Sequence, residues 1–167
     1  MDFSIRELTV DDAELIAPVH VRSWQAAYVG LIDQAVLDGL EVAQRVESWI
    51  ARLSGPNDGA RLLVERGAET VGFVVGSRHS PATHGAAEVF SIYLDPSVWR
   101  CGIGSALLDA GLAALREDGP TPVILWVVDG NERACRFYES RGWHFDGGRR
   151  GDRIGGGIVP HLRYRLD

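Results

Sequence analysis

The sequence predicts an α/β fold in which a single mixed, twisted sheet is flanked by helices. Two strand patterns joined by a short turn come early in the chain and predict antiparallel pairing. Later strand patterns alternate with helical ones, which favours a parallel central pair. No internal repeat or long linker divides residues 1–167, so the chain is expected to form one domain with one core.

The first half of the chain is expected to hold a strand, two helical regions and a β-hairpin. In chain order these cover residues 3–8, 9–24, 33–53, 61–66 and 70–77. Apolar residues recur with helical spacing in the second and third segments, the latter in one or two pieces. Pro18 marks a point where the first helix kinks or breaks. The turn at Gly67-Ala68-Glu69 makes the last two segments antiparallel neighbours.

The second half is expected to alternate strands with helices and to end in two short strands. In order, these are strand 87–94, helix 104–116, strand 123–128, helix 131–141, and strands near 143–145 and 158–165. The strand at 123–128 is apolar throughout, which is typical of a strand buried on both faces. The stretch 147–157 holds six glycines and three arginines. No helix follows it, so a mobile hairpin loop is favoured over a phosphate cradle.

Composition excludes several classes of function. Apolar residues make up 46% and charged residues 24%, as in soluble globular proteins, and the net charge of −6 argues against nucleic acid as a partner. Cys101 and Cys135 lack metal-ligand spacing and indicate free thiols in a reducing compartment. The five histidines are scattered, so no metal site is expected. No signal segment or long apolar run is visible, which predicts a cytoplasmic protein without membrane contact.

The most informative stretch is 94–108, where a strand stops at Asp95-Pro96 and a helix opens at Gly104 after a glycine-punctuated loop. In such a loop, several backbone N–H groups point outward at the positive end of the helix dipole. This arrangement suits a phosphate group. A dinucleotide fold fits poorly, because Leu107 replaces the third glycine and the loop follows three strands instead of one. A Walker-type loop is excluded because all 17 basic residues are arginine.

A second motif indicates which phosphorylated cofactor is bound. The segment 131–143 reads Asn-x-x-Ala-x-x-Phe-Tyr-x-x-x-Gly-Trp. Together with Trp99-x-x-Gly102-x-Gly104, it resembles the GNAT superfamily of N-acetyltransferases, which bind acetyl-coenzyme A (acetyl-CoA); only Trp143, in place of Phe, departs from the second motif. The element order agrees over nearly the whole chain. Trp99 stands where the family usually has Gln or Arg, so a pyrophosphate would be held mainly by backbone N–H groups.

The resemblance implies a set of cofactor-binding residues. The backbone of Ile92, Tyr93 and Leu94 would hydrogen-bond the pantetheine arm. The pyrophosphate loop would comprise Trp99, Arg100, Cys101, Gly102, Ile103, Gly104 and Ser105, and Asn131 would contact the coenzyme while capping the helix that follows. A tight strand-to-helix turn also needs glycine, and it would explain the loop without any ligand.

Two side chains are candidates for acid and base chemistry. By resemblance, Tyr138 would protonate the departing thiolate of the coenzyme, although an amphipathic core tyrosine fits the same helical position. Glu88, with a period of two, shares a face with Phe90, Ile92 and Leu94, where an unpaired carboxylate is costly to bury. It therefore either lies at the solvated strand start or lines a cleft. Some members of the family that the chain resembles carry a Glu at this place, and the resemblance implies a general base that acts directly or through water.

The acceptor pocket is expected between the first helices and the last hairpin, and its candidate lining residues are Trp24, Tyr28, Trp126 and His161. We expect direct acetyl transfer in a ternary complex to a primary amine of a small molecule, or less favourably to an α-amine of a peptide. The alternative from another class is a non-catalytic acyl-CoA-binding sensor or regulatory module. The sequence leaves the oligomeric state open, a homodimer being one option.

Overall fold

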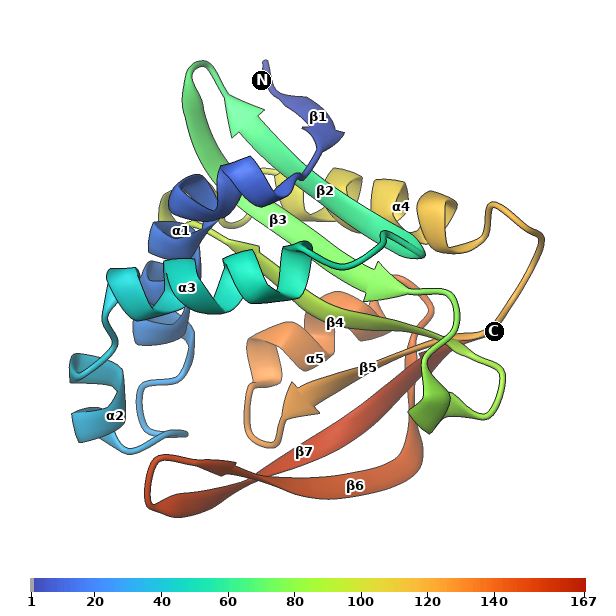
Figure 1. Cartoon of the computed structure of the whole chain (residues 1–167). Coiled ribbons are helices and arrows are strands. Elements are labelled where there is room, and N and C mark those ends of the chain that lie inside the picture. Colours follow the sequence, from blue (N-terminus) through green and yellow to red (C-terminus); the bar gives the residue numbers. More distant parts are fainter. Residues whose placement is uncertain (1) are drawn as a thin grey trace.

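The computed structural model describes residues 2–167 and contains one mixed sheet of seven strands (Figure 1). The strands are β1 (Ser4–Glu7), β2 (Gly59–Arg66), β3 (Glu69–Ser77), β4 (Ala87–Leu94), β5 (Val123–Val128), β6 (His144–Ile154) and β7 (Gly157–Leu166). They lie in the order β1-β2-β3-β4-β5-β7-β6, and only the β4–β5 pair is parallel. The predicted fold class is confirmed.

Helices cover both faces of the sheet (Figure 1). They are α1 (Ala13–Ala27), α2 (Gln34–Asp38), α3 (Val42–Leu53), α4 (Ile103–Leu115) and α5 (Glu132–Glu139), with short 3-10 turns η1 (Val10–Asp12), η2 (Pro81–Thr83) and η3 (Pro96–Val98). The face toward α4 and α5 buries the larger core, and α1 and α3 bury a second one around Trp49 and Phe73. A third cluster joins α2 to the tip of the β6–β7 hairpin.

Helix α1 runs through Pro18 without a break, although a kink or a break was expected there. The helical stretch 33–53, expected in one or two pieces, consists of two helices, α2 and α3, on either side of Gly39. Strand β7 agrees with the expected range 158–165, whereas β6 is much longer than the expected range 143–145. Most of the predicted glycine-rich loop lies inside β6, and the turn is confined to Gly155 and Gly156, because pairing with β7 continues up to Ile154.

Strands β4 and β5 pair over only three residues and then separate. Their register runs from Ala87 with Val123 to Val89 with Leu125. Beyond this point β4 remains paired only with β3, and β5 only with β7. The sheet therefore opens along its middle, between the second half of β4 and the second half of β5.

A β-bulge interrupts β4 beside this opening. Val75 pairs with Ser91 but Gly76 pairs with Val89, so Phe90 is the extra residue of β4. The expected single face for Glu88, Phe90, Ile92 and Leu94 is therefore wrong, because a bulge reverses the alternation of side chains. Ile92 and Leu94 pack on the α4 side, together with Ala87 and Val89. Glu88 points to the opposite face, in register with Ile124.

No helix among residues 2–167 combines the length and the apolar character that crossing a membrane requires. The same residues contain no group of three or more His, Cys, Asp or Glu side chains that could hold a metal ion.

Candidate active site

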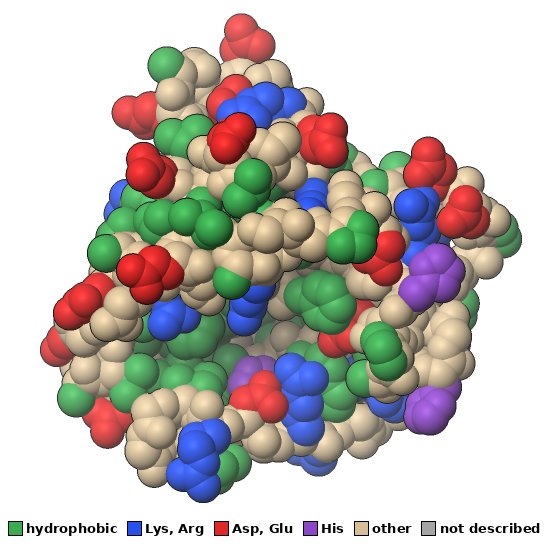
Figure 2. All heavy atoms as spheres, in the orientation of Figure 1, with side chains coloured by type: hydrophobic (Ala, Val, Ile, Leu, Met, Phe, Trp, Pro, Cys, Tyr) green, Lys and Arg blue, Asp and Glu red, His purple; other side chains and the backbone are tan. Residues whose placement is uncertain are grey.

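A cavity of about 600 Å³ fills the opening between β4 and β5. One half is lined by the loop before α4 and by α5, and the other half by α1, β4 and β5. Figure 2 shows the molecule hollowed below α3, between this helix and the β6–β7 hairpin, with hydrophobic side chains in the hollow. The cavity therefore joins a loop of phosphate-binding type to an apolar space beside the sheet.

The loop before α4 is held open by its backbone conformation. Arg100 and Gly102 have φ angles of 62° and 79°, both in the left-handed region. In the first main-chain hydrogen bond of α4, the N–H of Ala106 donates to the carbonyl of Gly102. The N–H groups of residues 103–105 therefore remain available to donate to a ligand. Asp95 fixes the start of the loop, since it accepts hydrogen bonds from Ser97 and forms an ion pair of 2.5 Å with Arg22 of α1.

Five of the seven predicted loop residues line the cavity: Trp99, Arg100, Gly102, Gly104 and Ser105. The other two turn away from it. Ile103 is fully buried in the core beneath α4, and the Cys101 thiol donates to the carbonyl of Trp99 at 3.6 Å. Their contribution to the loop is therefore limited to the backbone.

Helix α5 adds cations that the sequence reasoning missed. Arg133 and Arg136 line the cavity beside Arg100. The guanidinium carbon of Arg133 lies 3.3 Å from the centroid of the Trp99 ring, and Arg133 forms no ion pair with any carboxylate of residues 2–167. Burial and the neighbouring Arg100 lower the pKa of Arg133. This half of the cavity is locally basic despite the net charge of −6.

Alternate residues of β4 present their main chain to the opening. The N–H of Asp95 donates to the carbonyl of Val71 on β3. Because hydrogen bonding alternates along an antiparallel ladder, the main chain of Tyr93 also faces β3, whereas that of Ile92 and Leu94 faces the cavity. The carbonyl of Leu94 accepts the indole N–H of Trp99 at 3.1 Å, which agrees with this direction. The backbone of Ile92 thus points into the opening, and Tyr93 contributes its side chain.

Three tyrosines line the cavity: Tyr28, directly after α1, Tyr93 from β4 and Tyr138 from α5. Burial raises the pKa of each hydroxyl, and the neighbouring Tyr93 raises the pKa of Tyr138 further. Tyr138 is 8% exposed and packs against Trp143 and Tyr164. Its hydroxyl therefore stays protonated at neutral pH and is suited to donate.

Glu88 lies outside the lining of the cavity. Its side chain is 6% exposed, and its Oε2 accepts a hydrogen bond of 2.6 Å from the hydroxyl of Ser80. Ser80 lies in the connection between β3 and β4, directly before the 3-10 turn η2. Glu88 is thus a buried, hydrogen-bonded carboxylate rather than a solvated strand end.

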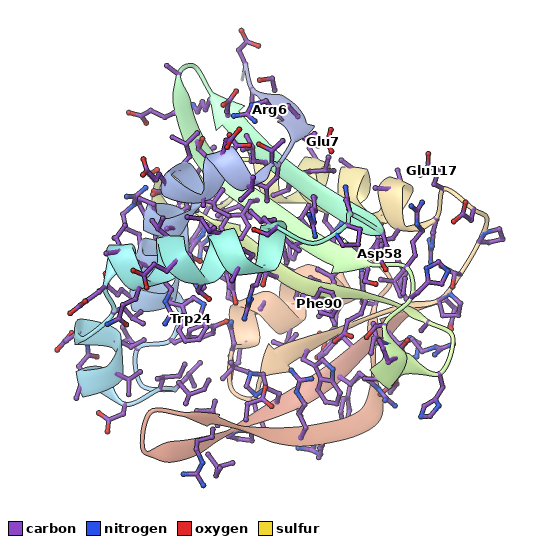
Figure 3. The ribbon with its side chains drawn as sticks, in the orientation of Figure 1. Arg6, Glu7, Trp24, Asp58, Phe90 and Glu117 are labelled. Carbon is purple, nitrogen blue, oxygen red and sulfur yellow. The ribbon has the colours of Figure 1, made fainter. Side chains whose placement is uncertain are left out.

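The structure separates the four predicted acceptor residues into two pairs. Tyr28 and Trp126 line the cavity. Trp24, on α1 (labelled in Figure 3), is not part of the lining; its ring makes an edge contact with that of Tyr28, with 5.2 Å between the ring centroids. His161 is turned toward β6, where its Nδ1 lies 3.0 Å from the carbonyl of Val159 and 3.6 Å from Asp152. Asn131 lines the cavity and also caps α5.

The fold, with its parted central strands and the loop before α4, defines an acyltransferase domain. A model of the acetyltransferase (GNAT) family matches residues 23–143. The chain belongs to this family, as the two sequence motifs indicated.

Related proteins agree with this assignment. The chain is 26% identical to a probable N-acetyltransferase of Mycobacterium tuberculosis, over 97% of this chain and 92% of the relative. It is 32% identical to the mycothiol acetyltransferase of Thermomonospora curvata over 85% of this chain, but spans only 48% of that relative. The PaiA N-acetyltransferase of Thermoplasma acidophilum, solved with coenzyme A, is 20% identical and superposes with a TM-score of 0.72 over 96% of this chain and 98% of its own.

Proposed function

We propose that this protein transfers an acetyl group from acetyl-CoA to a primary amine of a small molecule, directly and within a ternary complex. One observation carries the proposal: a single cavity connects a basic, N–H-rich loop to a space lined by Tyr28, Phe90 and Trp126, and Tyr138 lies between them. A phosphorylated thioester and an amine could therefore meet within one cavity. The coenzyme A bound to the PaiA relative supports the donor.

Each wall of the cavity has a role in this proposal. The N–H groups of residues 103–105 and the guanidinium groups of Arg100 and Arg133 would bind the pyrophosphate, since both offer donors to an anion. The main chain of Ile92, along the open edge of β4, would bind the pantetheine arm. These contacts orient the thioester toward the space beside Phe90.

The transfer requires an amine nitrogen to attack the thioester carbonyl, so that a C–N bond forms and the C–S bond breaks. Tyr138 would donate its phenolic proton to the departing sulfur, because its raised pKa keeps the proton available. The attacking amine must lose a proton. Glu88 would accept it through water, because its carboxylate does not reach the cavity wall.

The test is release of free thiol from acetyl-CoA with a panel of primary amines, accompanied by mass spectrometry of the acetylated product. Thiol release that depends on the amine, with one acetamide formed per thiol, is the expected result. Binding of CoA without thiol release from any amine would favour the non-catalytic sensor instead. Pre-incubation with acetyl-CoA followed by gel filtration should leave no acetylated protein, because transfer is direct.

A further inference from the structure

The bulge in β4 presents one large apolar side chain to the cavity. Phe90 is 52% exposed, although its neighbours Val89 and Ser91 are buried. Its ring lies in the hollow beneath α3 (Figure 3). Bulges beside active sites redirect side chains, and an exposed aromatic ring inside a cavity is a typical ligand contact. Nothing in the packing of the sheet requires a phenylalanine at this position.

Trp126 provides an opposing aromatic wall from β5. The guanidinium groups of Arg150 and Arg163 lie 4.4 and 5.7 Å from the centroid of its indole ring. These two arginines are themselves neutralised, since Arg150 pairs with Asp152 at 3.1 Å and Arg163 with Asp146 at 2.8 Å. The contacts orient the indole ring without leaving a free charge beside it.

The charges around this half of the cavity disfavour a cationic acceptor. The lining residues beside Phe90 and Trp126 are uncharged and include Ser23, Ala27, Tyr28, Ser91 and Val128. Within residues 2–167, no aspartate or glutamate belongs to the lining of the cavity, and Asp146 and Asp152 nearby are already paired with arginines. A second ammonium group on an acceptor would thus find no free carboxylate to replace its lost hydration.

We infer that the acceptor is a monoamine with an apolar, preferably aromatic body, and that Phe90 and Trp126 contact this body while the amine faces the thioester. The inference rests on the proposed function and names its substrate class. Polyamines and other polycations are excluded as preferred acceptors. Phe90 is then a specificity residue, because aromatic contacts of this kind change affinity roughly 2- to 10-fold.

Two measurements on the full-length protein test this inference separately from the proposed function. Affinities for benzylamine, cyclohexylmethylamine and putrescine are measured by ligand-observed NMR with saturating CoA, and turnover of the same amines is measured by thiol release. Phe90→Ala is compared with Phe145→Ala, which also removes a partly exposed phenylalanine but lies outside the cavity. Circular dichroism checks that both variants fold.

Benzylamine should bind most tightly and putrescine most weakly, and F90A should raise the Kd and KM for benzylamine roughly 2- to 10-fold while F145A leaves both unchanged. Tighter binding or faster turnover of putrescine overturns the inference and leaves the acetyltransferase proposal intact. An unchanged Kd for benzylamine in F90A also overturns the inference. The same holds if F90A loses as much affinity for CoA as it does for benzylamine. Benzylamine binding without turnover, while another amine of the wider panel is acetylated, overturns the inference and leaves the proposed function intact. Failure of all three amines to bind also overturns the inference, whereas the proposed function fails only if no amine of the wider panel releases thiol.

Discussion

The guanidinium carbon of Arg133 lies over the indole ring of Trp99, 3.3 Å from its centroid. The two residues come from α5 and from the loop before α4, so their contact connects the two elements that border the basic half of the cavity. Trp99 is fixed in turn, because its N–H donates to the carbonyl of Leu94. A residue that offers no charge of its own thus holds a cation beside the loop before α4.

We predict that Arg133→Ala weakens the binding of CoA by about 10- to 100-fold, because a charged hydrogen-bond donor to the pyrophosphate is lost. Isothermal titration with CoA measures this loss. Titration with pantetheine, which lacks the phosphates, should show no difference between the variant and the wild type. Arg66→Ala removes an exposed arginine on β2 and serves as the control for the change in net charge.

Trp99 should act only through Arg133. Trp99→Leu is therefore expected to weaken CoA binding by less than Arg133→Ala does, and to have no further effect in the R133A background. Additive losses in the double variant would show instead that Trp99 contacts the coenzyme itself. The same titrations provide this double-mutant cycle.

The sequence predicted the glycine-containing loop and the helix α4 that follows it, since both are local features. It could not predict Arg133 as a partner of Trp99, because that contact depends on how α5 packs beside the loop. The single face expected for Glu88, Phe90 and Leu94 was wrong for a different reason, since strict alternation does not allow for a bulge. Gly76 is the signal that was available: a lone glycine inside a strand pattern indicates a bulge or a close approach of backbones.

Tyr138→Phe should lower kcat by roughly 10- to 1000-fold with little change in the Kd of CoA, because the leaving thiolate loses its proton donor. Burial raises the pKa of this hydroxyl above the usual value near 10, so the wild-type rate should not decline with rising pH in the range where an exposed tyrosine titrates. Stopped assays from pH 7 to pH 10.5 test both points. A variant with undiminished turnover would remove Tyr138 from the mechanism.

Glu88→Gln should flatten the acidic limb of the pH–rate profile, because the amide occupies the same space but cannot accept the amine proton. Ser80→Ala is the companion variant, since it removes the hydroxyl that donates to the carboxylate and leaves the carboxylate in place. S80A should therefore keep an acidic limb, in contrast to E88Q. If E88Q keeps the wild-type limb, another group or bulk solvent takes the proton.

Gly76→Ala should disturb the bulge that exposes Phe90. A Cβ atom at this position would lie 2.5 Å from the carbonyl oxygen of Glu88, a backbone atom that cannot move without changing the β3–β4 register. We expect a loss of about 1–3 kcal/mol in the free energy of unfolding, measured by urea denaturation. Gly55→Ala is the matched control, because nothing lies within 4 Å of its added Cβ.

His20 should make the stability of the protein depend on pH. Its Nδ1 accepts the indole N–H of Trp49 at 3.0 Å, and burial, together with the charges of Arg45 and Arg52, lowers its pKa to about 3. The unfolded chain binds a proton at this residue near pH 6.5 but the folded chain does not, so stability falls as the pH drops from 6.5 toward 3.

His20→Asn retains an acceptor for Trp49 but does not titrate. The stability of the wild type relative to this variant should therefore decrease by about 2 kcal/mol between pH 7 and pH 5. His84→Asn controls for removing an imidazole at an exposed site. The free energy of unfolding of both proteins is measured by urea denaturation at each pH. If it changes equally with pH in the wild type and in H20N, His20 is not held neutral in the folded protein.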